Sequence, residues 1–169
     1  LLGNLPVHLR LRVVRADSGF CWEELLALWE RQGLPYIVSA RLTTRIQSLI
    51  RRDTVWRPTP VTGTEVAEVL HQEPGWRGPR RLILVRHRVV EKGRAGGRKL
   101  IDVPGYLFQA LVTSLPDHVA PVDVWRDYNQ RAGCEGVIKE LDQHYALPKL
   151  IVRRFWGTEA ALCLAVLSY

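Results

Sequence analysis

The sequence predicts an α/β fold, and three observations lead to this prediction. Residues 9–52 show the order strand, turn, helix, strand and helix. Residues 54–115 contain short β-like segments separated by prolines and glycines, and the remaining residues return to helical periodicity. With 169 residues, of which 47% are hydrophobic and 24% charged, the chain suffices for one domain with a hydrophobic core and a sizeable insertion.

The first predicted strand ends at a candidate functional acid. Apolar and basic residues alternate over 9–14, which is typical of a strand with one buried face. The strand leads into Asp17, Ser18 and Gly19, so the carboxylate of Asp17 would stand clear of the sheet edge. The alternative is that Asp17 or Ser18 caps the next helix.

A helix and a second strand follow this turn. Residues 20–32 carry leucines and a tryptophan at helical spacing, and Gly33 is a natural C-cap. Residues 35–40 predict a strand parallel to the first, because a helix connects the two. Residues 42–52 predict an amphipathic helix with its apolar side chains turned inward. The arginines predicted to face outward are Arg41, Arg45, Arg51 and Arg52.

Residues 54–115 are predicted to form a mostly antiparallel β insertion. Its strands would cover 65–71, 81–90 and 106–113, with the glycine-rich loop 93–97 at a hairpin tip. That loop lacks the Gly-Lys-Ser/Thr ending of a P-loop, so nucleotide binding is not expected. Trp56 and Trp76 each precede an arginine. Such aromatic residues either stack on unpaired bases or belong to the core, and the core interpretation is favoured for each one.

The C-terminal part is predicted to begin with a long helix that Pro121 opens and that ends before Pro148. In such a helix a single stripe holds an aromatic residue, two cations and two acids, and an apolar face adjoins it. These five are Tyr128, Arg131, Glu135, Lys139 and Asp142. A mixed-charge stripe is most often a solvated face with i,i+4 ion pairs, which is the alternative interpretation. Residues 155–169 predict a final buried helix.

The charge of the chain favours a polyanionic partner. The formal net charge is +7 and the pI is about 9.8, and arginine supplies most of the excess. Nine cations and one acid, Glu91, lie within residues 77–99. The cations are Arg77, Arg80, Arg81, Arg86, Arg88, Lys92, Arg94, Arg98 and Lys99. This stretch predicts either a DNA-binding surface or a solubilising edge that blocks strand pairing.

The cysteines and the hydropathy pattern indicate the cellular compartment of the protein. Cys21, Cys134 and Cys163 are odd in number and lack the spacing of a zinc site, which fits a reduced, cytoplasmic setting. No stretch reaches the ~20 apolar residues of a membrane span, so no membrane association is expected.

Several motifs in matching order resemble one family. The pattern Tyr128-x2-Arg131-x3-Glu135 is similar to the C-terminal signature of DDE insertion-sequence transposases. The Arg-Ala-Asp-Ser-Gly-Phe stretch at 15–20, the Ile-Lys-Glu-Leu stretch at 138–141 and the run 155–169 are similar to the group 1 branch of that family. The resemblance covers nearly the whole chain.

The resemblance implies a partial ribonuclease-H-like fold. Residues 1–53 and 116–169 would form the catalytic core, and 54–115 would be the β insertion before the last catalytic helix. It implies that Asp17 is the second catalytic acid and Glu135 the third, and that both bind Mg²⁺ or Mn²⁺. The reaction would be cleavage of a DNA strand by water, followed by strand transfer by the freed 3′-hydroxyl, in a bacterial cytoplasm.

DNA contacts are also implied. Tyr128 and Arg131 would touch the DNA backbone at the transposon end, and Lys139, Arg77 and Arg81 are further candidates for contacts to transposon ends or target DNA. Two divalent ions ~4 Å apart, held by carboxylates, can stabilise the attacking and leaving oxygens of such a reaction.

Two departures from the family pattern bear on activity. None of the sixteen residues before Asp17 is acidic, so the first catalytic carboxylate is missing, and Asp142 stands where the family has a lysine. We therefore expect a C-terminal fragment that is weak or inactive alone, with an incomplete sheet that favours aggregation or a homodimer. The alternatives are a non-catalytic basic DNA-binding module or degenerate remnant, and a basic α/β protein that binds another protein.

Overall fold

The computed structural model describes residues 11–52, 54–89 and 105–130. The chain divides into two compact units, Leu1–Tyr128 and Asn129–Tyr169. Only Asn129 and Gln130 of the second unit are among the described residues, so the architecture below is that of the first unit.

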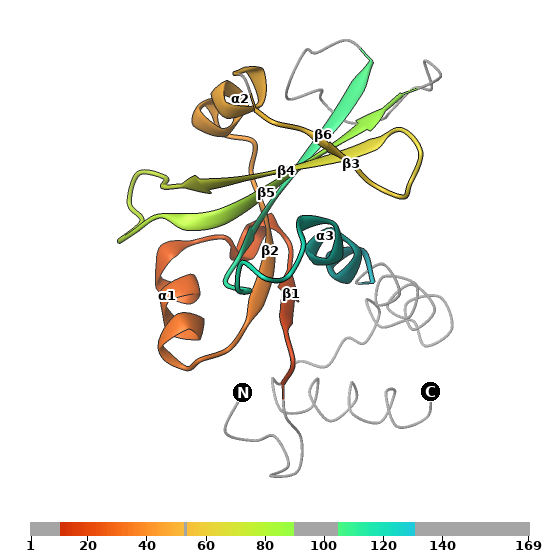
Figure 1. The fold of residues 1–169 in the computed structure, drawn as a ribbon. Coiled ribbons are helices and arrows are strands. Elements are labelled where there is room, and N and C mark those ends of the chain that lie inside the picture. Colours follow the sequence, from red (N-terminus) through yellow and green to blue (C-terminus); the bar gives the residue numbers. More distant parts are fainter. Residues whose placement is uncertain (1–10, 53, 90–104, 131–169) are drawn as a thin grey trace, which may run out of the picture. The chain divides into compact units, whose positions relative to one another are not determined.

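The N-terminal half of this unit is a parallel strand pair joined by a helix (Figure 1). Strand β1 (Val14–Ala16) leads into the short 3-10 helix η2 (Ser18–Phe20) and helix α1 (Glu23–Arg31), and β2 (Tyr36–Ala40) then pairs with β1 in parallel. Helix α1 stops where expected, because Gly33 follows with a φ of +64°, a conformation that glycine adopts without strain. Strand β1 begins later than predicted, at Val14.

Helix α2 (Thr44–Arg51) follows β2 directly. Thr43 caps its N-terminus by accepting a hydrogen bond from the backbone N–H of Ile46. Ile46 and Ile50 are buried, whereas the arginines of this helix are exposed. The helix therefore has the orientation that its apolar spacing predicts.

The next four strands are antiparallel, as predicted for this region. They are β3 (Arg57–Pro58), β4 (Thr64–His71), β5 (Arg80–Arg88) and β6 (Tyr106–Thr113). The sequence predicted three strands here and did not predict β3. Among the described residues the sheet has six strands in the order β1-β2-β6-β5-β4-β3. Strand β6 lies between β2 and β5 and pairs antiparallel with both. The predicted hairpin tip at 93–97 lies outside the described residues.

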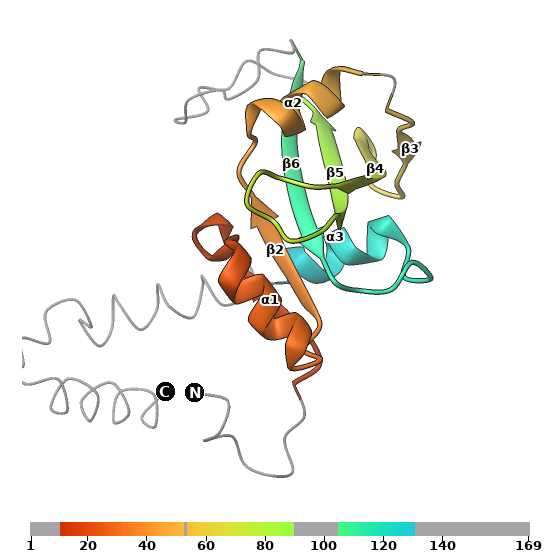
Figure 2. The same cartoon turned by 90° about the vertical axis from the view of Figure 1, so that its left-hand side faces the viewer.

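Each face of the sheet has its own hydrophobic core. Helices α1 and α2 cover one face and α3 (Pro121–Asn129) covers the other (Figure 2). The α1/α2 face buries Leu26, Tyr36 and Leu84, among others. Trp56 and Trp76 are partly buried against the same core, which agrees with the core interpretation of both.

Helix α3 begins at Pro121, as predicted, and anchors the opposite face through Val124 and Trp125. The continuation of this helix toward Pro148 and the final helix at 155–169 lie outside the described residues. The predicted α/β class is confirmed: three α-helices and a mostly antiparallel sheet in the described part of the chain are compatible with a partial ribonuclease-H-like fold. The division into a core and an insertion stays a prediction.

Candidate active site

Asp17 stands directly after the last residue of β1, at the carboxyl ends of the parallel strands. Its backbone is extended and its Oδ1 accepts a hydrogen bond of 2.8 Å from the N–H of Gly19, which makes Asp17 the N-cap of η2. A Cβ at position 19 would lie only 3.0 Å from this Oδ1. The Asp-Ser-Gly sequence thus allows a carboxylate and a backbone N–H to meet in a tight turn at the sheet edge.

The strand register shows what lies beside Asp17. Ala16 is opposite Val38, so Asp17 follows at the level of Ser39 on β2. A cleft of about 510 Å³ opens at this edge, and Ser18, Arg41 and Phe108 are among the residues that line it. The candidate acid therefore lies next to a hollow that the first residues after β2 help to form.

This edge of the sheet offers one oxygen ligand of the kind that a magnesium ion prefers, but not a complete set. Mg²⁺ prefers carboxylate oxygens, water and substrate oxygens, and Asp17 offers such a carboxylate at the end of a strand. Within residues 11–52, 54–89 and 105–130, no group of three acids, histidines or cysteines could hold a metal ion. One carboxylate does not make a metal site, so a metal site at this edge would need a second acid from the rest of the chain.

Glu135, the predicted partner of Asp17, lies outside the described residues, as do Arg131 and Lys139. Tyr128 is described and only 8% exposed, because its ring packs in the core under α3. Its assignment as a DNA contact stays a prediction, and only a small part of its surface is open to a ligand.

Arg77 and Arg81, the two candidates from the basic stretch, differ in environment. The side chain of Arg77 is 71% exposed, with Glu23 at 3.7 Å. The side chain of Arg81 is 7% exposed; it forms a two-pronged ion pair with Glu68 and donates to the carbonyl oxygens of Leu115, Pro116 and Val119. This geometry favours a structural role for Arg81 and leaves Arg77 open to a ligand.

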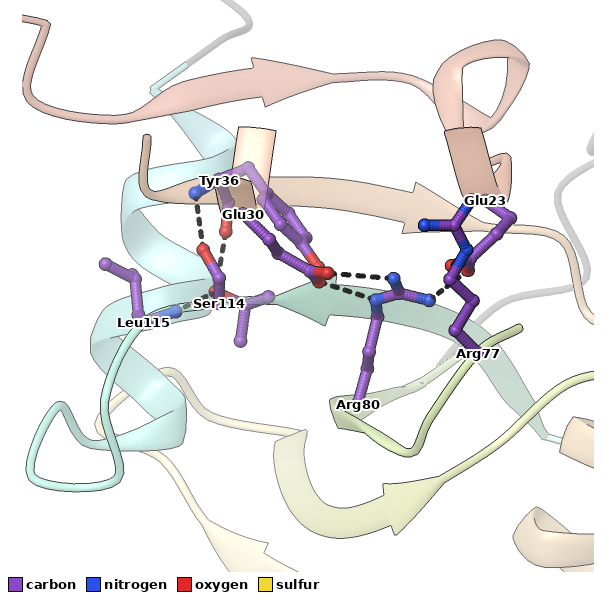
Figure 3. Close-up of polar contacts among 8 residues, drawn as sticks. Glu23, Glu30, Tyr36, Arg77, Arg80, Ser114 and Leu115 are labelled. Carbon is purple, nitrogen blue, oxygen red and sulfur yellow. Dashed lines mark hydrogen bonds and ion pairs between the residues drawn. The ribbon is translucent and has the colours of Figure 1, made fainter. Parts of the chain in front are cut away.

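Arg80, three residues after Arg77, is the centre of a buried ion-pair cluster (Figure 3). Its guanidinium donates to both oxygens of Glu30, at 2.6 and 3.0 Å, and to Glu23 at 2.6 Å. The hydroxyl of Tyr36 donates to the same Glu30, and the ring of Trp76 lies 5.1 Å from the guanidinium carbon. The cluster joins α1 to the sheet.

The ionisation of this cluster follows from its contacts. Hydrogen bonds from Arg80 hold the pKa values of Glu23 and Glu30 below the usual range, against the opposing effect of burial. Burial alone would lower the pKa of Arg80, but the hydrogen bonds to Glu30 and Glu23 outweigh it and raise that pKa. All three groups are therefore charged at neutral pH.

A second arginine is held in a similar way at the other end of β5. Arg86 donates to Glu65 at 2.6 Å and lies over the rings of Trp56 and Tyr106, at 4.5 and 5.0 Å. Four of the five arginines in the described part of the basic stretch thus have a carboxylate within ion-pair distance, namely Arg77, Arg80, Arg81 and Arg86. The positive field predicted from the cation count is weaker there than the sequence suggests.

Cys21 lies just after η2 and is a free thiol. Burial raises its pKa to about 11, so the thiol is protonated at neutral pH. Because the thiolate is the nucleophilic form, Cys21 is not a candidate nucleophile despite its place near Asp17.

Several of these contacts were not foreseen. The Arg80 cluster and the Arg86 stacking depend on glutamates that are distant along the chain, and the only hint in the sequence is the recurrence of Trp-Arg at 56–57 and 76–77. The outward arginines of α2 are exposed, as their helical spacing predicts.

The protein is of the mixed α/β class. Its parallel β1–β2 pair, with an acid at the carboxyl end and antiparallel strands continuing the sheet, is compatible with a partial ribonuclease-H-like fold. The family model described as transposase DDE domain group 1 matches residues 7–169. The chain therefore belongs to the DDE-domain transposases of group 1, and the family resemblance predicted from its motifs is confirmed. Among curated proteins, no sequence matches the chain significantly.

Family membership implies a transposase activity with DNA as the substrate, and such transposases generally use divalent metal ions. In the part of the chain that the structure describes, none of the helices has the length and apolar character needed to cross a membrane.

Proposed function

We propose that Asp17 and Glu135 are two of the metal-binding acids of a transposase that cleaves DNA strands at insertion-sequence ends and joins them to target DNA. The observation that carries this proposal is the position of Asp17 at the carboxyl end of a parallel strand pair, in a chain that matches the family model over 7–169. Bound Mg²⁺ or Mn²⁺ would stabilise charge on the attacking and leaving oxygens.

The roles of the other residues follow from their chemistry. Arg131 and Lys139 are proposed to contact phosphates of the transposon end, and Arg77 is proposed as a further contact because its guanidinium is open to solvent. Asp17 is proposed to keep its carboxylate fixed through the hydrogen bond from Gly19, which sets the direction of the ligand oxygens.

We further propose that residues 1–169, as an isolated polypeptide, cleave DNA weakly or not at all. No acid precedes Asp17 in this sequence, so only two of the three expected carboxylates are present. A site with fewer carboxylates holds divalent ions less firmly and positions them less well.

Nicking of supercoiled DNA tests the assignment. The chain is incubated with plasmid and Mg²⁺ or Mn²⁺ at high protein concentration, and any nicking should be lost with EDTA, with Asp17→Asn and with Glu135→Gln. Asp117→Asn is the matched control, because Asp117 is 96% exposed in the loop after β6. Nicking that survives Asp17→Asn and Glu135→Gln would remove both residues from the site.

Metal binding provides a second readout where nicking is too weak to follow. Paramagnetic Mn²⁺ should broaden the amide resonances of residues next to Asp17, and Asp17→Asn together with Glu135→Gln should abolish the broadening. Broadening that is the same in wild type and double variant would contradict the metal assignment.

A non-catalytic DNA-binding module, or a degenerate remnant of the enzyme, is the second candidate. Two observations favour it. The Oδ1 of Asp17 already accepts the hydrogen bond from Gly19 that caps η2, and Asp142 stands in the place of the family lysine. In that case the chain binds duplex DNA in a salt-dependent way that neither Mg²⁺ nor Glu135→Ala changes.

A further inference from the structure

We propose that the arginines of α2 and its approach, Arg41, Arg45, Arg51 and Arg52, form a surface that binds the phosphate backbone of duplex DNA beside Asp17. We call these four residues the α2 arginine face. The inference rests on the proposed function in one respect, since it takes the edge at Asp17 as the place where the DNA is cleaved.

The α2 arginine face carries charge that none of the residues described in the structure neutralises. All four side chains belong to exposed residues, and none of the ion pairs among the described residues involves them. Residues 41–52 contain no acid. This differs from β5, where Arg80, Arg81 and Arg86 are each bound to a glutamate.

The helix directs these charges to one side. At about 100° per residue, Arg45, Ser48 and Arg51 fall within an arc of about 120°. That arc is opposite to the buried Ile46 and Ile50, which hold α2 on the sheet. A helix anchored in this way presents cations at fixed positions, as a phosphate backbone requires.

Helix stability does not account for Arg45. The helix dipole favours acids in the first turn and cations in the last, and α1 follows this rule with Glu23 and Glu24 at its start and Arg31 at its end. Helix α2 has no acid in its first turn and has Arg45 there instead. Glu73 lies at this end of the helix, and its carboxylate already accepts hydrogen bonds from Thr43 and His71.

The α2 arginine face adjoins the edge that Asp17 occupies. Asp17 is level with Ser39, and Arg41 follows only two residues later. Ser18, Arg41 and Thr43 line the same cleft of about 510 Å³. Helix α2 lies at this end of the sheet, as both ribbon views show (Figures 1 and 2).

Duplex DNA is the polyanion that suits this surface. Arginine presents a planar fork of donors that matches phosphate oxygens, and exposed arginines without partners gain free energy by releasing counterions from DNA. A strand held along α2 would pass the cleft at Asp17, so the same contacts would bring a scissile phosphate to the proposed acid.

The test is the affinity of the full chain for a fluorescent duplex, measured in EDTA so that no cleavage can occur. Arg45→Gln/Arg51→Gln should weaken binding by about tenfold or more at 0.1 M salt. It should also reduce the slope of log K against log salt by about 1.8, which is about 0.9 for each lost phosphate contact. Arg45→Lys/Arg51→Lys keeps the charges and should restore most of the slope.

Arg31→Gln/Arg57→Gln is the matched control, because it removes two exposed arginines, from α1 and β3, that likewise have no ion pair among the described residues. It should change affinity much less than the α2 double variant. Equal weakening by the two double variants would show that only net charge matters and would overturn the inference, as would an α2 variant that binds like wild type.

A measurement on the unaltered chain keeps the inference testable if the variants fold poorly. An arginine-reactive dicarbonyl is applied with and without DNA, and the modified sites are read by mass spectrometry. DNA should protect Arg45 and Arg51 but not Arg126, and equal modification of Arg45 and Arg51 with and without DNA would overturn the inference. The proposed function is contradicted by a different result, namely nicking or Mn²⁺ broadening that does not change when Asp17 and Glu135 are substituted.

Discussion

Arg80 shows how one residue can join distant parts of the chain. Its side chain is 7% exposed, and its two glutamate partners lie on α1, 50 and 57 residues away in sequence. Removing one partner of a buried ion pair leaves the remaining charges without compensation, which costs more than the pair itself contributes. The cluster is therefore sensitive to loss of the arginine.

We predict that Arg80→Met lowers the free energy of unfolding by about 3 kcal/mol, the lower end of the range for breaking a buried pair. The nearly buried Glu23 loses its charged donor, whereas Glu30, whose side chain is 37% exposed, is partly compensated by water. Arg77→Ala removes an arginine that is 71% exposed and should cost less than about 1 kcal/mol. Urea unfolding followed by circular dichroism measures both. Equal losses for the two variants would contradict the structural role of Arg80.

The same cluster predicts a dependence of stability on pH. The pKa values of Glu23 and Glu30 are lower in the folded protein than the ordinary value of 4.5, because Arg80 donates to both carboxylates. Their contribution to stability is present above pH 4.5 and is lost as the pH falls below it through the folded pKa values.

Glu30→Gln should therefore flatten the decline in the urea midpoint between about pH 5 and pH 3, since it removes one of the groups that must be protonated. Glu24→Gln is the control, because Glu24 lies in the first turn of α1, whereas Arg80 pairs with Glu23 and Glu30. A pH profile that is the same in wild type and Glu30→Gln would sink this prediction.

At the scale of elements, Arg81 fastens the connection between β6 and α3. It donates to three carbonyl oxygens of residues 115–119 while Glu68 on β4 holds its guanidinium. Helix α3 is attached to the sheet by this connection and by Val124 and Trp125. The arginine is thus placed to hold helix α3 on the sheet.

We predict that Arg81→Ala costs about 2 to 3 kcal/mol, because several hydrogen bonds to a charged donor are lost and Glu68 is left without its partner. The variant should accelerate amide hydrogen exchange in residues 115–128 more than it accelerates exchange in β2. Arg126→Ala, an exposed change on α3 itself, should leave that exchange nearly unchanged. If Arg81→Ala accelerates exchange in all elements equally, the effect is global and the proposed local role is wrong.

At the scale of the whole molecule, β6 unites the regions before and after residue 54. It belongs to the stretch predicted as an insertion, yet it lies between β2 and β5 and hydrogen-bonds with both. Backbone hydrogen bonds and both hydrophobic cores therefore cross the predicted boundary. We expect residues 11–128 to unfold as one cooperative unit.

Ile37→Ala in β2 and Ile83→Ala in β5 test this expectation. Both side chains are fully buried, and each change should cost about 2 to 5 kcal/mol. Both variants should shift the same single unfolding transition. The transition is followed by tryptophan fluorescence in a Trp156→Phe background, so that the signal comes from the first unit. Two separate transitions, each moved by only one variant, would show that 54–115 is independent.

The local features of the fold could be predicted because they depend on neighbours along the chain. The Asp-Ser-Gly turn after a strand, the helix ended by Gly33 and the parallel pair joined by a helix all follow from short-range patterns. Strand β1 starts later than predicted, because the alternation over 9–14 shows β tendency without showing where a partner strand begins.

The sequence by itself determined the fold class, the place of Asp17 at a strand end and the outward arginines of α2, because helical and strand periodicity act over a few residues. Only the tertiary structure decided which arginines are neutralised and that β6 separates β2 from β5. In the sequence Arg81 is a candidate DNA contact and Arg80 belongs to the same basic stretch, but glutamates on other elements bind both after folding. A charge becomes available to DNA only when no folded neighbour compensates it, and a linear pattern does not contain that information.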